Sequence, residues 1–322
     1  SSATLADAMD RIAGRLHAEG VSPGDVVATL GGVTADHVAL YLGTLAAGAA
    51  VATLPTSAHP DQIAHMAANS SAGLLFADEG SMGVAEALSG IATRPLDGLI
   101  ALSATAMRAE PRAMAPGDLF DIIYSSGTTA MPKGIEHDAL FRSRQIDRLG
   151  RIGCGPGAVS LISTPIYSNT TLVALLPALC LGSSVVLMKK FDEAGWLKLA
   201  ERHRVTHAML VPVQIRRLLD HPDFDRTDLS AFEVKLTTSS PLPAATAAET
   251  LRRWPGRLVM IYGMTEGGVS AMLDCGAHPD KLHTVGRVVP NAELRIVGED
   301  GRELPPGETG EVVGRSPTVM LG

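Results

Sequence analysis

The segment YSSGTTAMPKG, residues 124–134, has the composition of a phosphate-binding loop. It holds two serines, two threonines, two glycines and one lysine directly after an apolar run. A polyphosphate needs closely spaced backbone N–H groups, small hydroxyl donors and a flexible cation, and this segment supplies all three. It is not a Walker loop, because Pro132 stands where that motif has glycine and Gly134 follows Lys133. A solvated Ser/Thr turn is the alternative, and a lysine directly after a proline favours the phosphate site.

The segment IYGMTEGG, residues 261–268, follows a strand-like run and gathers several groups that could contact a ligand. It offers an aromatic ring, a hydroxyl and a carboxylate in Tyr262, Thr265 and Glu266. Mg²⁺ in nucleotide sites is held by one or two carboxylates together with phosphate oxygens. Taken alone, Glu266 is more typical of a carboxylate at a helix N-terminus than of a metal ligand.

Three further segments follow strand-like runs: TTSSPLP (237–243), STPIYSNTT (163–171) and VPVQ (211–214). Ligands of open α/β sheets bind at the carboxyl ends of strands, so VPVQ is a candidate wall of a ligand pocket. The apolar character of these segments suits an organic acid. The alternatives are ordinary packing at strand ends and, for TTSSPLP, a plain turn with Pro243 in the first turn of a helix.

These segments together resemble a known family. YSSGTTAMPKG looks like the phosphate-loop signature of the adenylate-forming enzymes, the superfamily of acyl-CoA synthetases, peptide-synthetase adenylation domains and firefly luciferase. IYGMTEGG resembles the YGxTE motif of the family, and TTSSPLP resembles the turn at its adenine slot, with Ser239 and Ser240 in place of two glycines. The region 283–322, with Gly286 and Arg287, resembles the β-rich part that leads to the ribose site.

The resemblance implies a role for each matching residue. Tyr262 would stack on adenine, Thr265 would donate to the α-phosphate, and Glu266 would hold Mg²⁺ together with Thr128. It implies catalytic roles for Thr128, Lys133, Thr265 and Glu266. The nucleotide-binding set that it implies is Ser125, Ser126, Gly127, Thr128, Thr129, Lys133, Ser239, Ser240, Pro241, Tyr262, Gly263, Met264 and Thr265. The acid-pocket candidates are Tyr167, Asn169, Val211 and Gly268, and many relatives have histidine where this chain has Ser168.

One position of the phosphate segment departs from the family. Ala130 stands where relatives usually have glycine. If this position has a positive φ, an L-residue there costs about 1–2 kcal/mol. We therefore expect Ala130→Gly to tighten ATP binding in calorimetry, and unchanged or weaker binding would contradict this.

The elements that must position these segments alternate between helix-like and strand-like. The strand-like runs between residues 118 and 262 cover 119–124, 158–163, 184–188, 205–210, 234–238 and 258–262. Helix-like runs separate most of them, at 138–149, after 169, and at 193–203, 213–220 and 244–254. This order predicts a largely parallel sheet with both faces covered. The N-terminal part repeats the pattern, with helices at 5–19 and 36–47 around a strand at 26–30.

We therefore predict an α/β fold of two largely parallel, helix-flanked sheets and a small β-rich subdomain. The predicted parts are 1–108, 109–282 and 283–322, with a linker at 103–118 and a hairpin turn at Asp300–Gly301. By resemblance, the family's lysine-bearing C-terminal domain lies beyond residue 322. We expect a chain of only these residues to be weak or inactive in complete catalysis.

Composition excludes several classes of protein. The 322 residues are 46% hydrophobic and 19% charged, with a net charge of −7 and no dense basic run, so nucleic acid is not an expected partner. Two uncharged stretches, 37–55 and 170–188, read as buried helices that run into strands, not as membrane spans. Three cysteines without a pairing or zinc pattern, and an N-terminus without signal-peptide character, indicate a cytoplasmic protein. We expect structural roles for His203, His207 and His221, with His137 as the strongest candidate for an exception.

The resemblance implies an ATP-dependent carboxylic acid:CoA ligase that forms an acyl-adenylate from an organic or fatty acid. ATP, Mg²⁺ and CoA are the expected cofactors, a small carboxylic acid is the expected substrate, and a homodimer is compatible with the family. Two alternatives stay open: a peptide-synthetase-type adenylation domain that loads a carrier-protein thiol, and a nucleotide- or acyl-binding protein without turnover.

Overall fold

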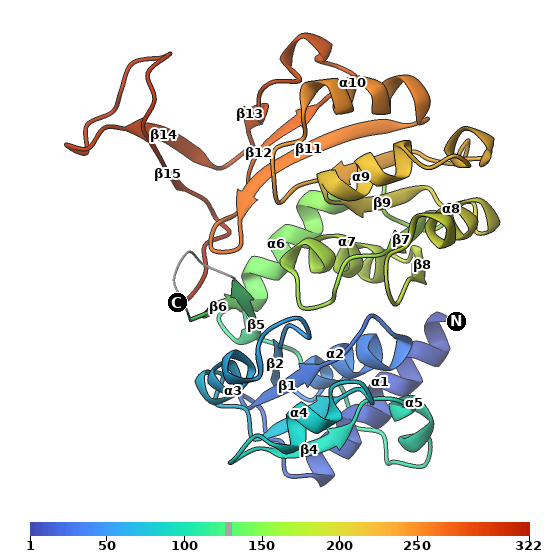
Figure 1. The fold of residues 1–322 in the computed structure, drawn as a ribbon. Helices are drawn as coiled ribbons and strands as arrows, with labels where there is room; N and C mark the ends of the chain where they lie inside the picture. Colours follow the sequence, from blue (N-terminus) through green and yellow to red (C-terminus); the bar gives the residue numbers. More distant parts are fainter. Residues whose placement is uncertain (126–130) are drawn as a thin grey trace.

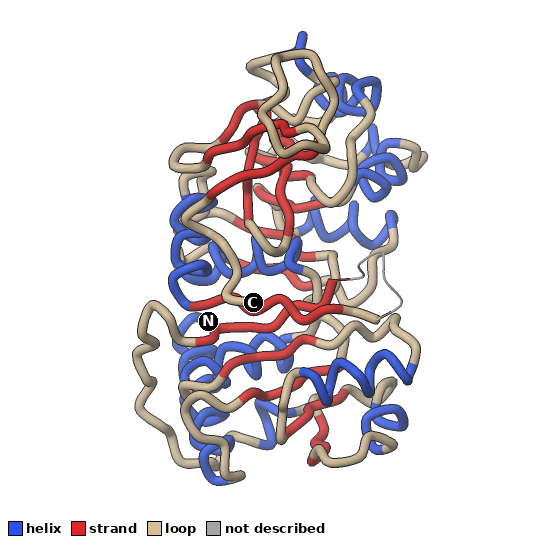
Figure 2. The backbone as a smooth tube through the Cα atoms, turned by 90° about the vertical axis from the view of Figure 1, so that its left-hand side faces the viewer, coloured by secondary structure: helices blue, strands red, loops and turns tan. Residues whose placement is uncertain are grey.

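Two large sheets and one small sheet make up the fold (Figure 1). The computed structural model describes residues 1–125 and 131–322. The N-terminal half and the following half lie one above the other, and the red strands of Figure 2 show the two sheets as separate layers. The predicted α/β fold with two largely parallel sheets and a small β unit is confirmed.

The first sheet has the strand order β4-β3-β1-β2-β5-β6. All its strands are parallel except β6, which runs antiparallel to β5. Its strands are β1 Val26–Leu30, β2 Ala50–Thr53, β3 Leu74–Ala77, β4 Ala92–Pro95, β5 Leu119–Ser125 and β6 Lys133–Asp138. The helices of this half are α1 Ser2–Ala18, α2 Ala35–Ala46, α3 Pro60–Asn69, α4 Met82–Glu86 and α5 Leu99–Leu102.

The placement of β5 corrects one prediction. The sequence assigns the strand at 119–124 to the second sheet, but β5 pairs with β2 through Val51 and Asp121 and belongs to the first. An apolar strand has the same pattern whichever sheet it joins, so periodicity did not separate the two cases. The first sheet therefore extends to Asp138. The domain boundary between residues 108 and 109 stays a prediction.

The second sheet has the strand order β13-β12-β11-β10-β9-β7-β8. Strands β7 to β11 are parallel, and β12 and β13 are added antiparallel. Its strands are β7 Val159–Ile162, β8 Ser184–Leu187, β9 His207–Leu210, β10 Val234–Thr237, β11 Arg257–Met264, β12 Gly268–Asp274 and β13 Arg287–Val288. The helices are α6 Ala139–Gly150, α7 Asn169–Cys180, α8 Glu193–Arg202, α9 Pro212–Leu219 and α10 Ala244–Arg253, with short 3₁₀ turns at Phe224–Arg226 and Pro279–Lys281.

The small sheet pairs β14 Glu293–Val297 with β15 Glu311–Arg315, and it projects from the upper half in Figure 1. The predicted turn at Asp300–Gly301 is confirmed, because Gly301 has a φ of 75° and the Gly298 N–H donates to the Arg302 carbonyl at 2.9 Å. A Cβ at φ > 0 is unfavourable, which explains the glycine.

Both uncharged stretches are buried helices that run into strands, as predicted. They form α2 running into β2 and α7 running into β8. In the part of the chain that the structure describes, no helix is long and apolar enough to cross a membrane. Tyr41 and Ile123 of the first half share one core cluster with Ile162 and Leu172 of the second, so apolar packing joins the halves.

His37, buried on α2, makes stability depend on pH. Its Nδ1–H donates to the Gly32 carbonyl at 2.9 Å, and its Nε2 lies 2.8 Å from the Thr29 hydroxyl. Burial lowers the pKa of His37 from 6.5 to about 4. The unfolded chain therefore binds more protons than the folded chain between these values, and stability falls as the pH falls.

We expect His37 to reduce the free energy of unfolding by about 3 kcal/mol between pH 7 and pH 4. Urea denaturation across this range measures it, and His37→Gln should flatten the slope. The same change at exposed His59 is the control and should leave the slope unchanged. Equal slopes for the wild type and His37→Gln would contradict the prediction.

Candidate functional site

A cavity of about 840 Å³ lies where elements of the two sheets meet. Ile123 and Tyr124 at the end of β5 line it, as do the loop before α7 and the β11–β12 hairpin. These segments follow the carboxyl ends of parallel strands, where ligands bind in open α/β sheets. The predicted residues that line it are Tyr167, Asn169, Ser239, Gly263, Met264, Thr265, Glu266 and Gly268.

A second cavity of about 470 Å³ adjoins the first. Ser239, Ser240 and Pro241 line it together with Tyr262. Ser239 and Gly263 line both cavities, so the two spaces share a wall. The resemblance assigns this turn and this aromatic residue to an adenine slot, and the structure brings them to one cavity. Leu242, at the end of the turn, and Tyr262 line the same cavity although their positions in the sequence differ by 20.

Ser239 occupies an unusual backbone conformation at this shared wall. Its φ is 78°, a left-handed value that L-residues rarely adopt. Its hydroxyl lies 2.9 Å from the hydroxyl of Thr170, which comes from the start of α7. The serine thus keeps the backbone geometry of a glycine position and adds a polar contact across the cavity.

Glu266 lies in the turn of a β-hairpin, which excludes the helix N-terminus that the sequence left open. Residues 265–267 connect β11 to β12, and the pairing shifts register between Tyr262 and Gly263. A Cβ on Gly263 would lie 2.1 Å from the Gly268 carbonyl oxygen, so only glycine fits this bulge. Gly268 has a φ of 64° for the same tight connection.

Backbone contacts fix this turn from outside the hairpin. The Met320 N–H donates to the Glu266 carbonyl at 2.8 Å, and His137 Nε2 donates to the Thr265 carbonyl at 2.8 Å. The Glu266 side chain is half-buried, lines the larger cavity and makes no hydrogen bond or ion pair with residues 1–125 or 131–322.

Glu266 therefore fits a magnesium site that is completed by phosphate oxygens. No group of three or more His, Cys, Asp or Glu side chains in the described part of the chain has the arrangement of a metal site. Mg²⁺ is commonly bound through one or two carboxylates plus substrate phosphates, so a single free carboxylate on a cavity wall is sufficient.

The phosphate segment begins and ends at the edge of the larger cavity. Tyr124 and Pro132 line the cavity, and Lys133 opens β6 opposite Ser125 as an exposed residue. The Tyr124 hydroxyl donates to the Met66 carbonyl at 2.8 Å, which anchors the end of β5 on α3. The predictions for Ser126, Gly127, Thr128, Thr129 and Ala130 lie outside the described residues.

One pocket candidate is placed elsewhere. Val211 is the residue before α9 and does not line either of these two cavities in the described part of the chain. The side chain of Gln214 accepts a hydrogen bond from the Val211 N–H at 3.1 Å and donates one to the Ser163 carbonyl at 3.4 Å. These bonds link the residue after β9 to the residue after β7. Ordinary strand-end packing, the alternative at this position, accounts for Val211.

A buried polar network behind the cavity was missed by the sequence. Asp121 accepts from Tyr41 at 2.5 Å and from Arg142 Nη2 at 2.7 Å, and its Oδ1 lies 2.8 Å from His137 Nδ1. The side chains of Asp121, His137 and Arg142 are fully buried. Burial raises the pKa of Asp121, but Arg142 and the bond from His137 outweigh it and lower the pKa to about 2. A charged residue inside the otherwise apolar strand LFDIIY was the signal that could have revealed the network.

His137 therefore supports the β11–β12 turn from behind the larger cavity, whereas His207 is structural. His137 joins β6 to the β11–β12 turn and stacks on Phe141 with ring centroids 4.1 Å apart. His207 Nδ1 lies 2.7 Å from the Thr206 hydroxyl, and its Nε2 donates to the Ile152 carbonyl at 3.3 Å, in the sheet and away from both cavities.

Comparison with protein families gives one match that spans the chain. The family model described as AMP-binding enzyme matches residues 1–322. The feruloyl-CoA synthase of Amycolatopsis sp is 32% identical over 332 residues, which cover 99% of this chain and 65% of that protein. The fatty acid–[acyl-carrier-protein] ligase ScoC of Streptomyces coeruleorubidus is 28% identical, over 97% of this chain and 63% of that protein. The chain thus spans slightly less than two thirds of these relatives.

Solved structures of this architecture agree over nearly the whole chain. ATP-bound MatB from Rhodopseudomonas palustris superposes with a TM-score of 0.88 at 26% identity, over 99% of this chain and 65% of that one. The amide bond synthetase McbA from Marinactinospora thermotolerans gives a TM-score of 0.88 at 29% identity, over 99% of this chain and 66% of that one.

Proposed function

Because the chain belongs to the AMP-binding enzyme family, we propose that it forms the nucleotide- and acid-binding part of an AMP-forming carboxylic acid:CoA ligase. The substrate would be an organic or fatty acid, and a thiol, CoA, would accept the acyl group. Relatives named as feruloyl-CoA synthase and 4-coumarate–CoA ligase support this assignment.

The observation that carries the proposal is that the candidate residues for binding the nucleotide, the metal ion and the acid line two adjoining cavities. Tyr262 and Ser240 line the smaller cavity. Glu266 lines the larger cavity together with the apolar side chains of Val173 and Val269. A nucleotide in the smaller cavity would place its phosphates toward Glu266. A carboxylic acid in the larger cavity would then lie beside them.

The proposed reaction has two balanced steps. A carboxylate oxygen attacks the α-phosphorus of ATP, the bond to the bridging oxygen breaks, and acyl-AMP and pyrophosphate result. The sulfur of a deprotonated thiol then attacks the acyl carbon, and AMP leaves with the electrons of the broken C–O bond. Mg²⁺, when bound, neutralises charge on the phosphates.

The residues of this chain supply binding, orientation and charge in that reaction. Tyr262 would hold adenine, Thr265 would donate to the α-phosphate, and Glu266 with Thr128 would hold the metal ion. Lys133 would stabilise negative charge on the phosphates. Such preorganised donors and charges account for most of the catalysis in reactions of this type.

The acceptor of the acyl group distinguishes a CoA ligase from a carrier-loading enzyme and from an amide synthetase. Relatives include a ligase named for an acyl-carrier protein and a synthetase named for amide bonds, so a carrier thiol or an amine competes with CoA. A peptide-synthetase-type pocket needs an acidic partner for the substrate amino group. Among the described residues that line the larger cavity, Glu266 is the one carboxylate, which favours an acid without an amino group.

Pyrophosphate exchange into ATP with a panel of acids, in the full-length protein, tests the proposal. We expect exchange with aryl or aliphatic acids, and CoA should then yield the thioester. Exchange with amino acids alone would support the carrier-loading alternative. Tight ATP binding without any exchange would support a binding protein.

A cytoplasmic location and a homodimer remain predictions.

A further inference from the structure

A buried arginine holds two amide side chains of the larger cavity from behind. Arg142 Nη1 donates to Gln145 Oε1 and to Asn169 Oδ1, each at 2.7 Å. Nη2 of the same guanidinium donates to both oxygens of Asp121, at 2.9 and 2.7 Å. Because Arg142 and Asp121 are fully buried, this arrangement is held by protein contacts alone.

The chemistry of the guanidinium fixes the orientation of both amides. A guanidinium only donates hydrogen bonds, so the amide oxygens must face Arg142 and the NH₂ groups must point away from it. Asn169 Nδ2 makes no hydrogen bond with any residue that the structure describes. Gln145 is only 3% exposed, and its Nε2 is buried without a hydrogen-bond partner in that part of the chain.

Both amides line the larger cavity; Asn169 is half-buried, whereas the unpartnered Gln145 Nε2 is buried, and a buried donor without a partner is costly. Asn169 also opens α7, whose 12 residues place the positive end of the helix dipole at the same wall. These observations favour an anionic ligand that accepts hydrogen bonds. Asp121 is paired with Arg142 and His137, so the network behind the wall presents no unpaired negative charge that would repel it.

We propose that Asn169 donates from Nδ2 to the carboxylate of the acid substrate, and that Arg142, held by Asp121, is the positioning residue that aims it. This inference rests on the proposed function, because it takes the larger cavity as the acid pocket. The carboxylate would lie between Asn169 and Thr265, with the rest of the acid along Val173 and Val269.

Asn169→Asp separates this role from a structural one. The aspartate keeps an oxygen for Arg142, so the melting temperature should not fall. The lost NH₂ donor and the added negative charge should weaken binding of the acid roughly 10- to 100-fold, as expected for a hydrogen bond to a charged group. The affinity for ATP should stay unchanged. Calorimetry with 4-coumarate and octanoate as probes, and the KM for each acid, measure this in the full-length protein.

A double-mutant cycle tests whether Arg142 acts through Asn169. Lysine at position 142 keeps the charge beside Asp121 but lacks the planar fork that reaches two acceptors. We expect Arg142→Lys and Asn169→Ala to weaken acid binding to a similar extent, and the double variant to be no worse than either. Residues that act as one unit are non-additive, whereas independent effects add.

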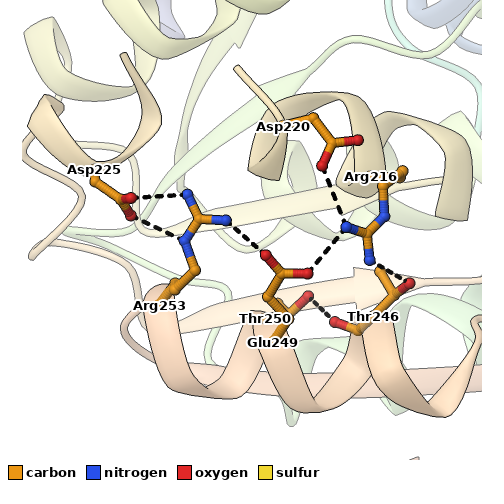
Figure 3. Close-up of polar contacts among 7 residues, drawn as sticks. All are labelled: Arg216, Asp220, Asp225, Thr246, Glu249, Thr250 and Arg253. Atoms are coloured by element: carbon orange, nitrogen blue, oxygen red, sulfur yellow. Dashed lines mark hydrogen bonds and ion pairs between the residues drawn. The ribbon is translucent and has the colours of Figure 1, made fainter. Parts of the chain in front are cut away.

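The matched control lies on the far side of the second half, in the network of Figure 3. Arg253 pairs with Asp225 at 2.9 Å and with Glu249 at 2.7 Å, and its side chain is 15% exposed. Arg253→Lys makes the same chemical change outside both cavities. It should leave the affinity for acid and ATP unchanged.

The outcomes separate this inference from the proposed function. Additive losses, or normal acid affinity in Asn169→Asp, would overturn the role of Asn169 and Arg142 while exchange activity still supports the ligase. A wild type that binds either probe without exchange would overturn the ligase, and the binding cycle would then decide the inference. A wild type that binds neither probe would overturn the inference.

Discussion

Asp121→Asn is expected to lower the free energy of unfolding by about 3–5 kcal/mol. The change keeps the shape of the side chain but removes the only carboxylate that Arg142 contacts among the described residues. Arg142 would then be a buried charge without a counter-ion. Urea denaturation at pH 7 measures the loss.

Asp225→Asn is the control for this change. Asp225 also forms a two-point contact with an arginine, Arg253, but its side chain is 68% exposed. An exposed ion pair contributes about 0–1 kcal/mol, so the control should be nearly neutral. Equal losses for the two variants would contradict the assignment of Asp121 as a buried counter-ion. Replacing Arg142 by methionine together with Asp121→Asn should recover part of the stability, because no unpaired charge remains.

Glu266→Gln is expected to reduce pyrophosphate exchange on the order of 10²-fold or more. Glutamine keeps the size of the side chain on the cavity wall but cannot supply the negative charge that a metal ion requires. The backbone of the turn is held by Met320 and His137, so the hairpin should keep its structure.

Calorimetry with ATP in the presence and absence of Mg²⁺ checks this second prediction independently of turnover. The wild type should bind ATP more tightly with the metal ion, and Glu266→Gln should lose that difference. Glu308→Gln, in an exposed turn of the small β unit, is the control and should keep it. A variant at Glu266 that retains the full Mg²⁺ effect would show that other residues hold the ion.

Local patterns predicted many of the elements because those patterns depend on neighbours in the sequence. The strand at 26–30 was predicted with its observed bounds, and the helices α2, α6 and α8 to α10 lie within one or two residues of their predicted positions. Strands β3, β4, β6 and β12 were not predicted. Lys133–Asp138 is polar enough to read as a loop, and pairing with β5 makes it a strand. Gly268–Asp274 is mostly apolar but short, and its pairing with β11 is a contact of the folded chain.

The candidate site divides in the same way. Tyr262, Glu266 and Ser239 to Pro241 were identified from motifs, and the structure brings them to adjoining cavities. Arg142 was not identified, because an arginine on a helix looks like a surface residue until its neighbours are known. It is buried here because β5 supplies Asp121 and α7 supplies Asn169 at the same point.

The sequence by itself determined the family, the order of the motifs and the α/β alternation, because these depend on residue types and on short spacings. The tertiary structure alone decided that β5 belongs to the first sheet, that Glu266 lies in a hairpin turn, and that Asp121, His137 and Arg142 meet behind the cavity. Each of these depends on contacts between residues far apart in the chain. Burial and charge pairing select such contacts only when whole elements pack, and no local pattern records that selection.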